Sequence, residues 1–302
     1  MRESKNDWFT YSIISTKITK KKYMINNKRH AIKELKDISK EIRKNIIKSI
    51  SKAGSGHTGG SLGLADVFTV LYFQILNYDP KNPNWEDRDR LVLSIGHVAP
   101  VHYATLAQAG YFPVEELISL RKLGSRLQGH PGRDHGLPGI ELSAGSLGQG
   151  LSVGVGMALS AKMDKKNWKV FTIHGDGELQ EGSIWEAAMS AAHYKLNNLI
   201  ALVDRNRVQI DGKTSDVMEI EPLKDKWKAF GWEVINCNGN SISELVAAYN
   251  SALLSKEKPV VIIAETKMGK GVKSIEGDYR WHGKAPSKDQ LNGFLQEIDK
   301  SY

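Results

Sequence analysis

The chain has 302 residues, of which 40% are hydrophobic and 25% are charged, so it can bury a large core in one big α/β domain or two smaller ones. No apolar stretch reaches the ~20 residues that a membrane-spanning helix needs, and the start lacks the apolar segment of a secretory signal, so we expect a cytoplasmic protein without membrane partners. The single cysteine, Cys237, excludes an internal disulfide and a multi-cysteine zinc site.

The net charge of +8 is concentrated at the start of the chain. Residues 1–52 contain 15 Lys and Arg against 5 Asp and Glu, so the remainder carries a small negative balance. A basic arm with few aromatic residues and no nucleic-acid-reading motif is typical of a solvated tail, so we expect no nucleic-acid partner. We interpret residues 1–25 as a basic N-terminal extension, in which Met24 is an alternative start, and residues 26–302 as one domain.

The first third of the chain predicts two helices and a strand. Apolar residues recur every three or four positions over 31–53, which predicts an amphipathic helix. The loop "AGSGHTGGSLG" separates it from a second helical run over 64–76. Pro80 and Pro83 then exclude helix from the turn-rich segment "NYDPKNPNWEDRDR", and a strand is predicted over 91–95, before "GHVAP".

The rest of the chain alternates helices with strands. Helices are predicted at 101–108, 152–162, 183–196, 223–230 and 242–254, and strands at 170–173, 199–204, 232–236 and 260–265. The loops "GHPGRDHGLPG" and "SAGSLGQG" lie between the first two of these helices. The alternation predicts an α/β fold, with a doubly wound parallel sheet and helices on both faces.

Two oxygen-bearing side chains follow neighbouring predicted strands. Asp176 lies between Gly175 and Gly177 in "HGDGELQEG", directly after the strand at 170–173, and Asn206 follows the strand at 199–204. Glycines let the chain turn sharply and approach a ligand, although Gly-Asp-Gly also suits an ordinary tight turn. Ligands in such folds bind outside the carboxyl ends of the strands. Carboxylate, amide and carbonyl oxygens there suit Mg²⁺.

One long segment resembles a known cofactor motif. "GDGELQEGSIWEAAMSAAHYKLNNLIALVDRNRVQIDG" is similar to the thiamine-diphosphate motif of the transketolase family, and the resemblance continues through "SGHTGGSLG", "SIGHVAP", "QGHPG", "GSLGQG" and "WHGK". It implies that Asp176, Asn206 and the backbone carbonyl of Val208 hold Mg²⁺, which anchors the diphosphate of thiamine diphosphate.

The resemblance also assigns roles to four of the nine histidines. It implies that His57 and His282 act as acid/base or acceptor-orienting groups, that His130 lies at the terminal hydroxyl of the donor sugar, and that His97 lies nearest the diphosphate. Imidazole suits proton transfer because its ordinary pKa is ~6.5. His135 has no clear counterpart, and His102, His174 and His193 are expected to pack or to face solvent.

Further cofactor contacts follow from the same resemblance. It implies that Gly145, Leu147 and Gly148 of "GSLGQG" approach the cofactor, together with Gly175, Gly177, Ile210 and His282. Ser146 departs from the family, which usually has proline there. Glu181 and Glu186 match acidic positions at the family's subunit interface, although acidic residues are favoured at any helix start.

The activity implied is the transfer of a two-carbon ketol unit from a ketose or ketose phosphate to an aldose or aldose phosphate. The chain ends at Tyr302, soon after "WHGK", where a single-chain transketolase would continue into its pyrimidine-binding half. We therefore expect the N-terminal, diphosphate-binding subunit of a split transketolase. Its partner would be a C-terminal, pyrimidine-binding subunit that carries the activating glutamate, in a heterotetramer with two copies of each chain. Ordinary pentose phosphates and unusual sugars both remain open as substrates.

Three other functions remain open from the sequence. The first is another thiamine-diphosphate enzyme, similar to deoxyxylulose-phosphate synthase or to the α subunit of a 2-oxo-acid dehydrogenase. The second is a dinucleotide-binding oxidoreductase, because "GQGLSVG" comes close to G-x-G-x-x-G but spaces its last glycine differently. The third is a catalytically silent assembly subunit, against which the retention of Asp176, Asn206 and the four histidines argues.

Overall fold

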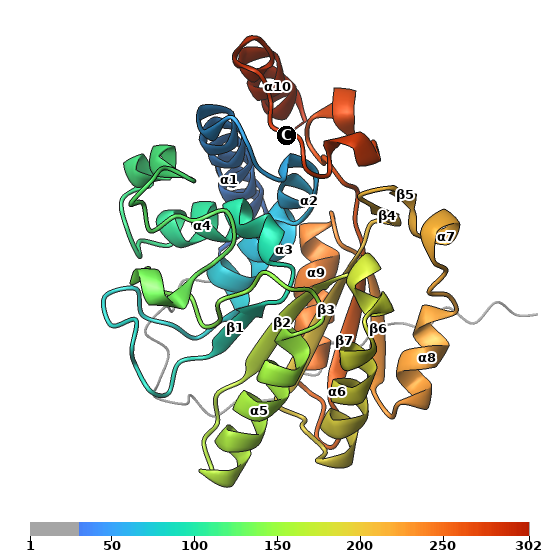
Figure 1. The fold of residues 1–302 in the computed structure, drawn as a ribbon. Coiled ribbons are helices and arrows are strands. Elements are labelled where there is room, and N and C mark those ends of the chain that lie inside the picture. Colours follow the sequence, from blue (N-terminus) through green and yellow to red (C-terminus); the bar gives the residue numbers. More distant parts are fainter. Residues whose placement is uncertain (1–29, 302) are drawn as a thin grey trace, which may run out of the picture.

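Five parallel strands form the central sheet of the computed structural model, which describes residues 30–301 (Figure 1). Their spatial order is β1–β2–β3–β7–β6. The strands are β1 (Arg90–Leu93), β2 (Val170–Gly175), β3 (Leu199–Arg205), β6 (Glu233–Asn238) and β7 (Val260–Glu265), and a separate antiparallel hairpin joins β4 (Val208–Gln209) to β5 (Gly212–Lys213). The basic extension expected at residues 1–25, and the alternative start at Met24, lie outside the described residues.

The helices surround this sheet. They are α1 (Ile32–Ala53), α2 (Thr58–Gly63), α3 (Ala65–Val70), α4 (Ala99–Gln108), α5 (Gly150–Met163), α6 (Gly182–His193), α7 (Thr214–Val217), α8 (Leu223–Ala229), α9 (Ile242–Ala252) and α10 (Lys288–Lys300). Shorter helical turns are η1 (Leu71–Ile75), η2 (Gly96–Val98), η3 (Val114–Ser119), η4 (Arg133–His135), η5 (Gly177–Gln180), η6 (Lys273–Ile275) and η7 (Tyr279–Trp281).

Helices cover both faces of the sheet, which confirms the predicted doubly wound α/β fold. Figure 1 shows α5 and α6 in front of the strands and α9 behind them. Alternate residues of one strand enter two different hydrophobic clusters, because successive strand side chains point to opposite faces. Phe171 and Ile173 pack with α1, α3, α4 and α9, whereas Val170 packs with α5, α6 and α8.

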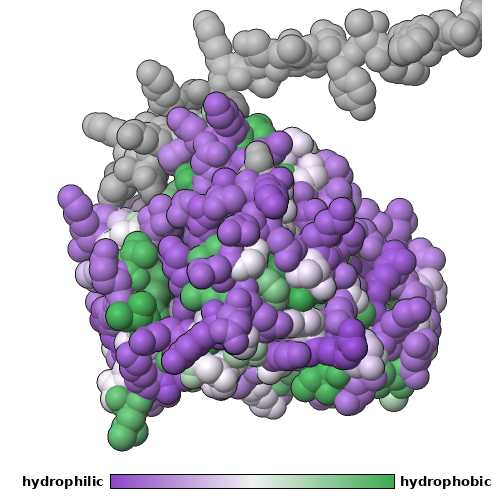
Figure 2. All heavy atoms as spheres, turned by 90° about the horizontal axis from the view of Figure 1, so that it is seen from above, coloured by the Kyte–Doolittle hydropathy of each residue, from purple (hydrophilic) through white to green (hydrophobic). Residues whose placement is uncertain are grey.

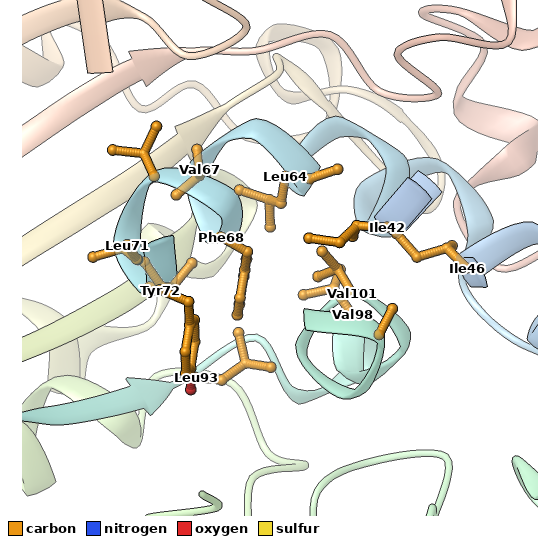
Figure 3. Close-up of a cluster of buried hydrophobic side chains, with 14 of the residues drawn as sticks. Ile42, Ile46, Leu64, Val67, Phe68, Leu71, Tyr72, Leu93, Val98 and Val101 are labelled. Atoms are coloured by element: carbon orange, nitrogen blue, oxygen red, sulfur yellow. The ribbon is translucent and has the colours of Figure 1, made fainter. Parts of the chain in front are cut away.

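The larger cluster joins the first helices to the edge of the sheet. Figure 3 shows Ile42 and Ile46 of α1 close to Leu64, Val98 and Val101, and all five are buried. Burial of one such side chain contributes about 1.5–3 kcal/mol relative to exposure. α10 lies along α1, so the C-terminal helix closes the same layer.

The face of the molecule seen from above is mainly hydrophilic. Seen from above, its hydrophobic side chains form scattered groups among polar ones (Figure 2). Within residues 30–301, we find no helix with the length and apolar character needed to cross a membrane.

The structure differs from the predicted elements chiefly near residue 60. The segment expected as a loop contains α2, and the helix expected over 64–76 ends in the π-helical turn η1. α2 carries three glycines and is fully buried; a Cβ on Gly60 would lie 2.8 Å from a methyl of Val98. Close packing therefore outweighs the poor helix propensity of glycine. α10 was not predicted either, although Ser287 and Gln290 form a capping box at its start.

Candidate active site

A pocket of about 360 Å³ opens at the carboxyl ends of β2 and β3. Residues far apart in the sequence line it, from η2, the loop before α5, η5 and the β4–β5 hairpin, together with four histidines and Met268. The parallel arrangement brings these segments to one edge of the sheet, as the sequence predicted.

Asp176 and Asn206 lie together in this pocket with Val208. The Asp176 carboxylate accepts hydrogen bonds from the backbone N–H groups of Gly177 (2.8 Å) and Arg207. The Asn206 side chain accepts a hydrogen bond from the Val208 N–H (3.0 Å) and donates one to the Asp204 carboxylate (3.0 Å). The structure thus places a carboxylate and an amide in one pocket, at the ends of two neighbouring strands.

Two buried carboxyl groups, Asp176 and Asp204, have raised pKa values in the part of the pocket around Asp176 and Asn206, called here the Asp176–Asn206 corner. Burial, and then the negative charge of Asp204, raises the pKa of Asp176 to about 7. Burial also raises the pKa of Asp204 to about 6. A bound cation would favour the ionised form of both groups. Within residues 30–301, no three His, Cys, Asp or Glu side chains cluster as metal ligands, so a cation here would rely on amide and carbonyl oxygens as well.

Four histidines converge on the same pocket. The ring centre of His57 lies 5.0 Å from that of His97, 6.0 Å from that of His130 and 5.6 Å from that of His282. Burial lowers the pKa of His57 to about 4, with the charges of His282 and Arg121 adding to the effect, and lowers the pKa of His97 to about 3. Burial also lowers the pKa values of His130 and His282. The rings are therefore neutral near pH 7, so each has one nitrogen that donates and one that accepts a hydrogen bond.

Two of these rings have buried nitrogen atoms that are not satisfied. The Nδ1 atoms of His57 and His282 have no hydrogen-bond partner among the described residues. Buried polar groups are normally hydrogen-bonded, so an unpaired one requires an explanation. Both atoms are closed to solvent, so a ligand in the pocket would reach them only if the rings turned.

The glycine-rich loop "GSLGQG" borders the pocket on another side. Gly145 and Leu147 line it, whereas Gly148 is not part of the lining. Gly148 has a positive φ of 84°, and a Cβ there would lie 2.7 Å from the Ser183 hydroxyl and 2.8 Å from Cβ of Glu181. Glycine is needed at this position for both backbone conformation and space.

The pocket also contains residues to which the sequence assigned no role. Asp204 lies in β3, two positions before Asn206, and Glu178 lies on η5 with its side chain fully buried. Gln180 donates a hydrogen bond to the side-chain oxygen of Gln209 (2.9 Å) across the pocket wall. Glu178 is part of the "GDGELQEG" segment, so its acidic side chain next to the glycines was the available signal.

The remaining residues singled out from the sequence lie partly in the pocket and partly outside it. Gly175, Gly177, Ile210 and Glu181 line the pocket. His102 is buried beside Tyr72, and its Nε2 lies 2.9 Å from the Tyr72 hydroxyl. His174 is also buried. Five of the residues are exposed: His135, His193, Glu181, Glu186 and Ile210.

Comparison with known proteins identifies relatives of the whole described domain. Residues 35–298 match the family described as "Transketolase, thiamine diphosphate binding domain". The chain is 43% identical over 262 residues to one of the subunits of the apulose-4-phosphate transketolase of Phocaeicola vulgatus, and the match covers 87% of this chain and 92% of that protein. It is 44% identical over 259 residues to the 6-deoxy-6-sulfo-D-fructose transketolase subunit SqwG of Clostridium sp.. That match covers 86% of this chain and 94% of SqwG.

Longer relatives match over only part of their length. Human transketolase is 39% identical over 271 residues, which are 88% of this chain but 42% of that protein. The crystal structure of Campylobacter jejuni transketolase superimposes with a TM-score of 0.80 at 32% identity and covers 90% of this chain. The chain spans about half the length of that solved structure, 47%.

Proposed function

The chain belongs to the transketolase family, as a counterpart of its thiamine-diphosphate-binding domain, and we propose that it is the diphosphate-binding subunit of a two-component transketolase. The enzyme would transfer a two-carbon ketol unit from a ketose to an aldose. One observation carries the proposal: the Asp176–Asn206 corner and the four histidines share a single pocket.

The residues of the corner fit a metal ion that holds a diphosphate. Asp176, Asn206 and the carbonyl of Val208 would supply oxygen ligands to Mg²⁺, which commonly bridges a protein carboxylate and phosphate groups. When bound, thiamine diphosphate supplies the electron sink that lets a carbon–carbon bond of the ketose break. Gly175 and Gly177 would allow the backbone to approach the diphosphate, and Leu147 and Ile210 would give apolar contact to its rings.

The histidines would orient the sugar and move protons. His57 and His282 are neutral and line the pocket, so their imidazole rings would take part in proton transfer with a sugar hydroxyl. His130, beside His57, would bind the terminal hydroxyl of the donor, and His97 would lie nearest the diphosphate. Gly145 would shape the wall on the cofactor side, and Gly148 would allow the turn of the same loop behind it.

The similarity to relatives that are themselves named as subunits supports a separate partner chain. We expect that partner to be the C-terminal, pyrimidine-binding subunit, which supplies the activating glutamate, in a cytoplasmic heterotetramer of two copies of each chain. Exposed Glu181 and Glu186 would lie at its interfaces. The relatives act on apulose 4-phosphate and 6-deoxy-6-sulfofructose by name, so the substrates proposed here are ketoses with an anionic group, pentose phosphates included.

Reconstitution tests this function. The purified chain alone should show no ketol transfer between a panel of ketose phosphates and an aldose phosphate, with thiamine diphosphate and Mg²⁺ present. Addition of the partner subunit should restore transfer, and removal of either cofactor should abolish it. Turnover by the chain without its partner would contradict the two-component assignment.

A further inference from the structure

The Glu178 carboxylate joins three segments that meet at the floor of the pocket. Its Oε1 accepts hydrogen bonds from the Ser94 hydroxyl, which follows β1, and from the Gly148 N–H (2.8 Å). Its Oε2 accepts a hydrogen bond from the Gly175 N–H (3.2 Å) at the end of β2 and lies 3.1 Å from His174 Nδ1. One side chain therefore spans the "GSLGQG" loop and the Gly-Asp-Gly turn.

The groups around Glu178 fit a carboxylate but not a neutral amide of the same shape. Backbone N–H groups can only donate, and Gly148 and Gly175 address different carboxylate oxygens. An amide in place of the carboxylate has one accepting oxygen and one donating nitrogen. Whichever way a glutamine turned, its NH₂ would face either the Gly148 or the Gly175 N–H, and that contact would be lost.

Further hydrogen bonds hold the carboxylate in place. His174 Nε2 lies 2.8 Å from the Thr172 hydroxyl, so the imidazole is fixed from both sides. The Ser94 hydroxyl also accepts a hydrogen bond from the Gly150 N–H (2.9 Å), at the start of α5. Glu178 and His174 are fully buried, with side-chain exposures of 0% each. Buried and satisfied networks of this kind are rigid.

We propose that Glu178 is a positioning residue of the cofactor site, which holds the loop that carries Leu147 and the turn that carries Asp176 at the separation that thiamine diphosphate and its metal require. Glu178 acts through Gly148 and Gly175 rather than by touching the cofactor. The inference rests on the function proposed above, and it adds a residue to which that function gave no role.

Glu178→Gln in the full chain, assembled with its partner subunit, tests this inference. We would remove the cofactor, titrate thiamine diphosphate at fixed Mg²⁺ and measure the dissociation constant by calorimetry. The variant should bind ~10-fold or more weakly, the size of effect found for residues that orient metal ligands. Activity should recover at saturating cofactor, because the chemical groups remain in place.

Asp89→Asn is the matched control. Asp89 is also a buried carboxylate that accepts two backbone N–H bonds from different segments, Asn77 (2.8 Å) and Lys169 (2.7 Å), but it precedes β1 at the opposite end of the strand. This variant should lower the melting temperature and leave cofactor affinity unchanged. If Glu178→Gln does not fold, Glu178→Asp keeps the charge but is one methylene too short to reach both loops, and should weaken binding in the same way.

The possible results distinguish a failure of the proposed function from a failure of the positioning role of Glu178. A wild-type complex that does not bind thiamine diphosphate with Mg²⁺ would overturn the proposed function and this inference with it. Wild-type binding with unchanged affinity in a folded Glu178 variant would overturn the positioning role alone. Equal loss of affinity in Asp89→Asn would also overturn it, because general destabilisation would then explain the effect.

Discussion

The rings of His57 and His282 lie 5.6 Å apart between centres and are almost perpendicular, at 88°, although 225 positions separate them in the chain. Each has a buried Nδ1 without a hydrogen-bond partner among the described residues. The arrangement places two neutral imidazoles in one pocket, and the proposed function assigns them proton transfer with a bound hydroxyl group.

His57→Ala should therefore lower kcat by ~100-fold or more while the dissociation constant of thiamine diphosphate changes little, because general acid–base groups contribute ~10²–10⁴-fold. Steady-state kinetics of the assembled enzyme and calorimetric titration measure the two effects. His135→Ala, an exposed histidine outside the pocket, is the control and should behave as wild type. A kcat near wild type for His57→Ala would leave that residue without a catalytic role.

Asp176→Ala should weaken Mg²⁺-dependent binding of thiamine diphosphate by ~10- to 100-fold or more, since even the outer partners of metal ligands have effects of that size. Asn206→Ala should act in the same direction. Titration of the cofactor at several Mg²⁺ concentrations measures the coupling, and Asp225→Ala on the exposed side of α8 serves as control. Wild-type affinity in both pocket variants would exclude the metal assignment.

The buried Arg43–Asp66 ion pair should make the fold sensitive to acid. The Arg43 Nη2 and Asp66 Oδ2 atoms lie 2.8 Å apart, with side-chain exposures of 0% and 4%. Burial alone would raise the pKa of Asp66, but the charge of Arg43 and hydrogen bonds from Arg43, Ser39 and Asn240 outweigh it and lower the pKa. The stabilisation is therefore complete above the unfolded pKa of ~3.9 and is lost as the pH falls through the lower folded value.

Asp66→Asn should cost about 3–5 kcal/mol of unfolding free energy near pH 7, because it removes one charge of a buried ion pair. The variant should also lose part of the acid dependence below about pH 4, the region of the ordinary Asp pKa. Urea unfolding of both proteins from neutral to acidic pH measures these quantities. Identical slopes of unfolding free energy against pH would show that Asp66 does not carry the dependence.

Gly96→Ala should destabilise the protein and disturb the pocket wall. A Cβ at Gly96 would lie 2.0 Å from the backbone oxygen of Ala144, and backbone atoms cannot rotate away as a flexible side chain can. Overpacking of this kind costs about 1–3 kcal/mol or more. Gly156→Ala is the control, because a Cβ in that part of α5 meets nothing within 4 Å and alanine favours helix by about 1 kcal/mol. Thermal unfolding of both variants should show opposite shifts.

The pattern of apolar residues along the chain determined the strands and most of the helices. The run Val170–Ile173 is apolar throughout, as expected for a parallel strand that helices cover on both faces. The structure has β2 there. The three- and four-residue spacing over 31–53 likewise predicted α1. The positions of Asp176 and Asn206 at one edge of the sheet follow from the same alternation, since the carboxyl ends of parallel strands lie together.

Only the tertiary structure determined the contacts between segments that are far apart in the sequence. α2 forms despite three glycines because its tight packing against Val98 and the 267–268 segment excludes larger residues, which no local propensity reveals. His57 and His282 became neighbours only through the docking of helices and loops around the sheet. No pattern in the sequence indicates the role proposed for Glu178. Its carboxylate can join Gly148 and Gly175 only after folding has brought both backbone N–H groups within hydrogen-bonding distance.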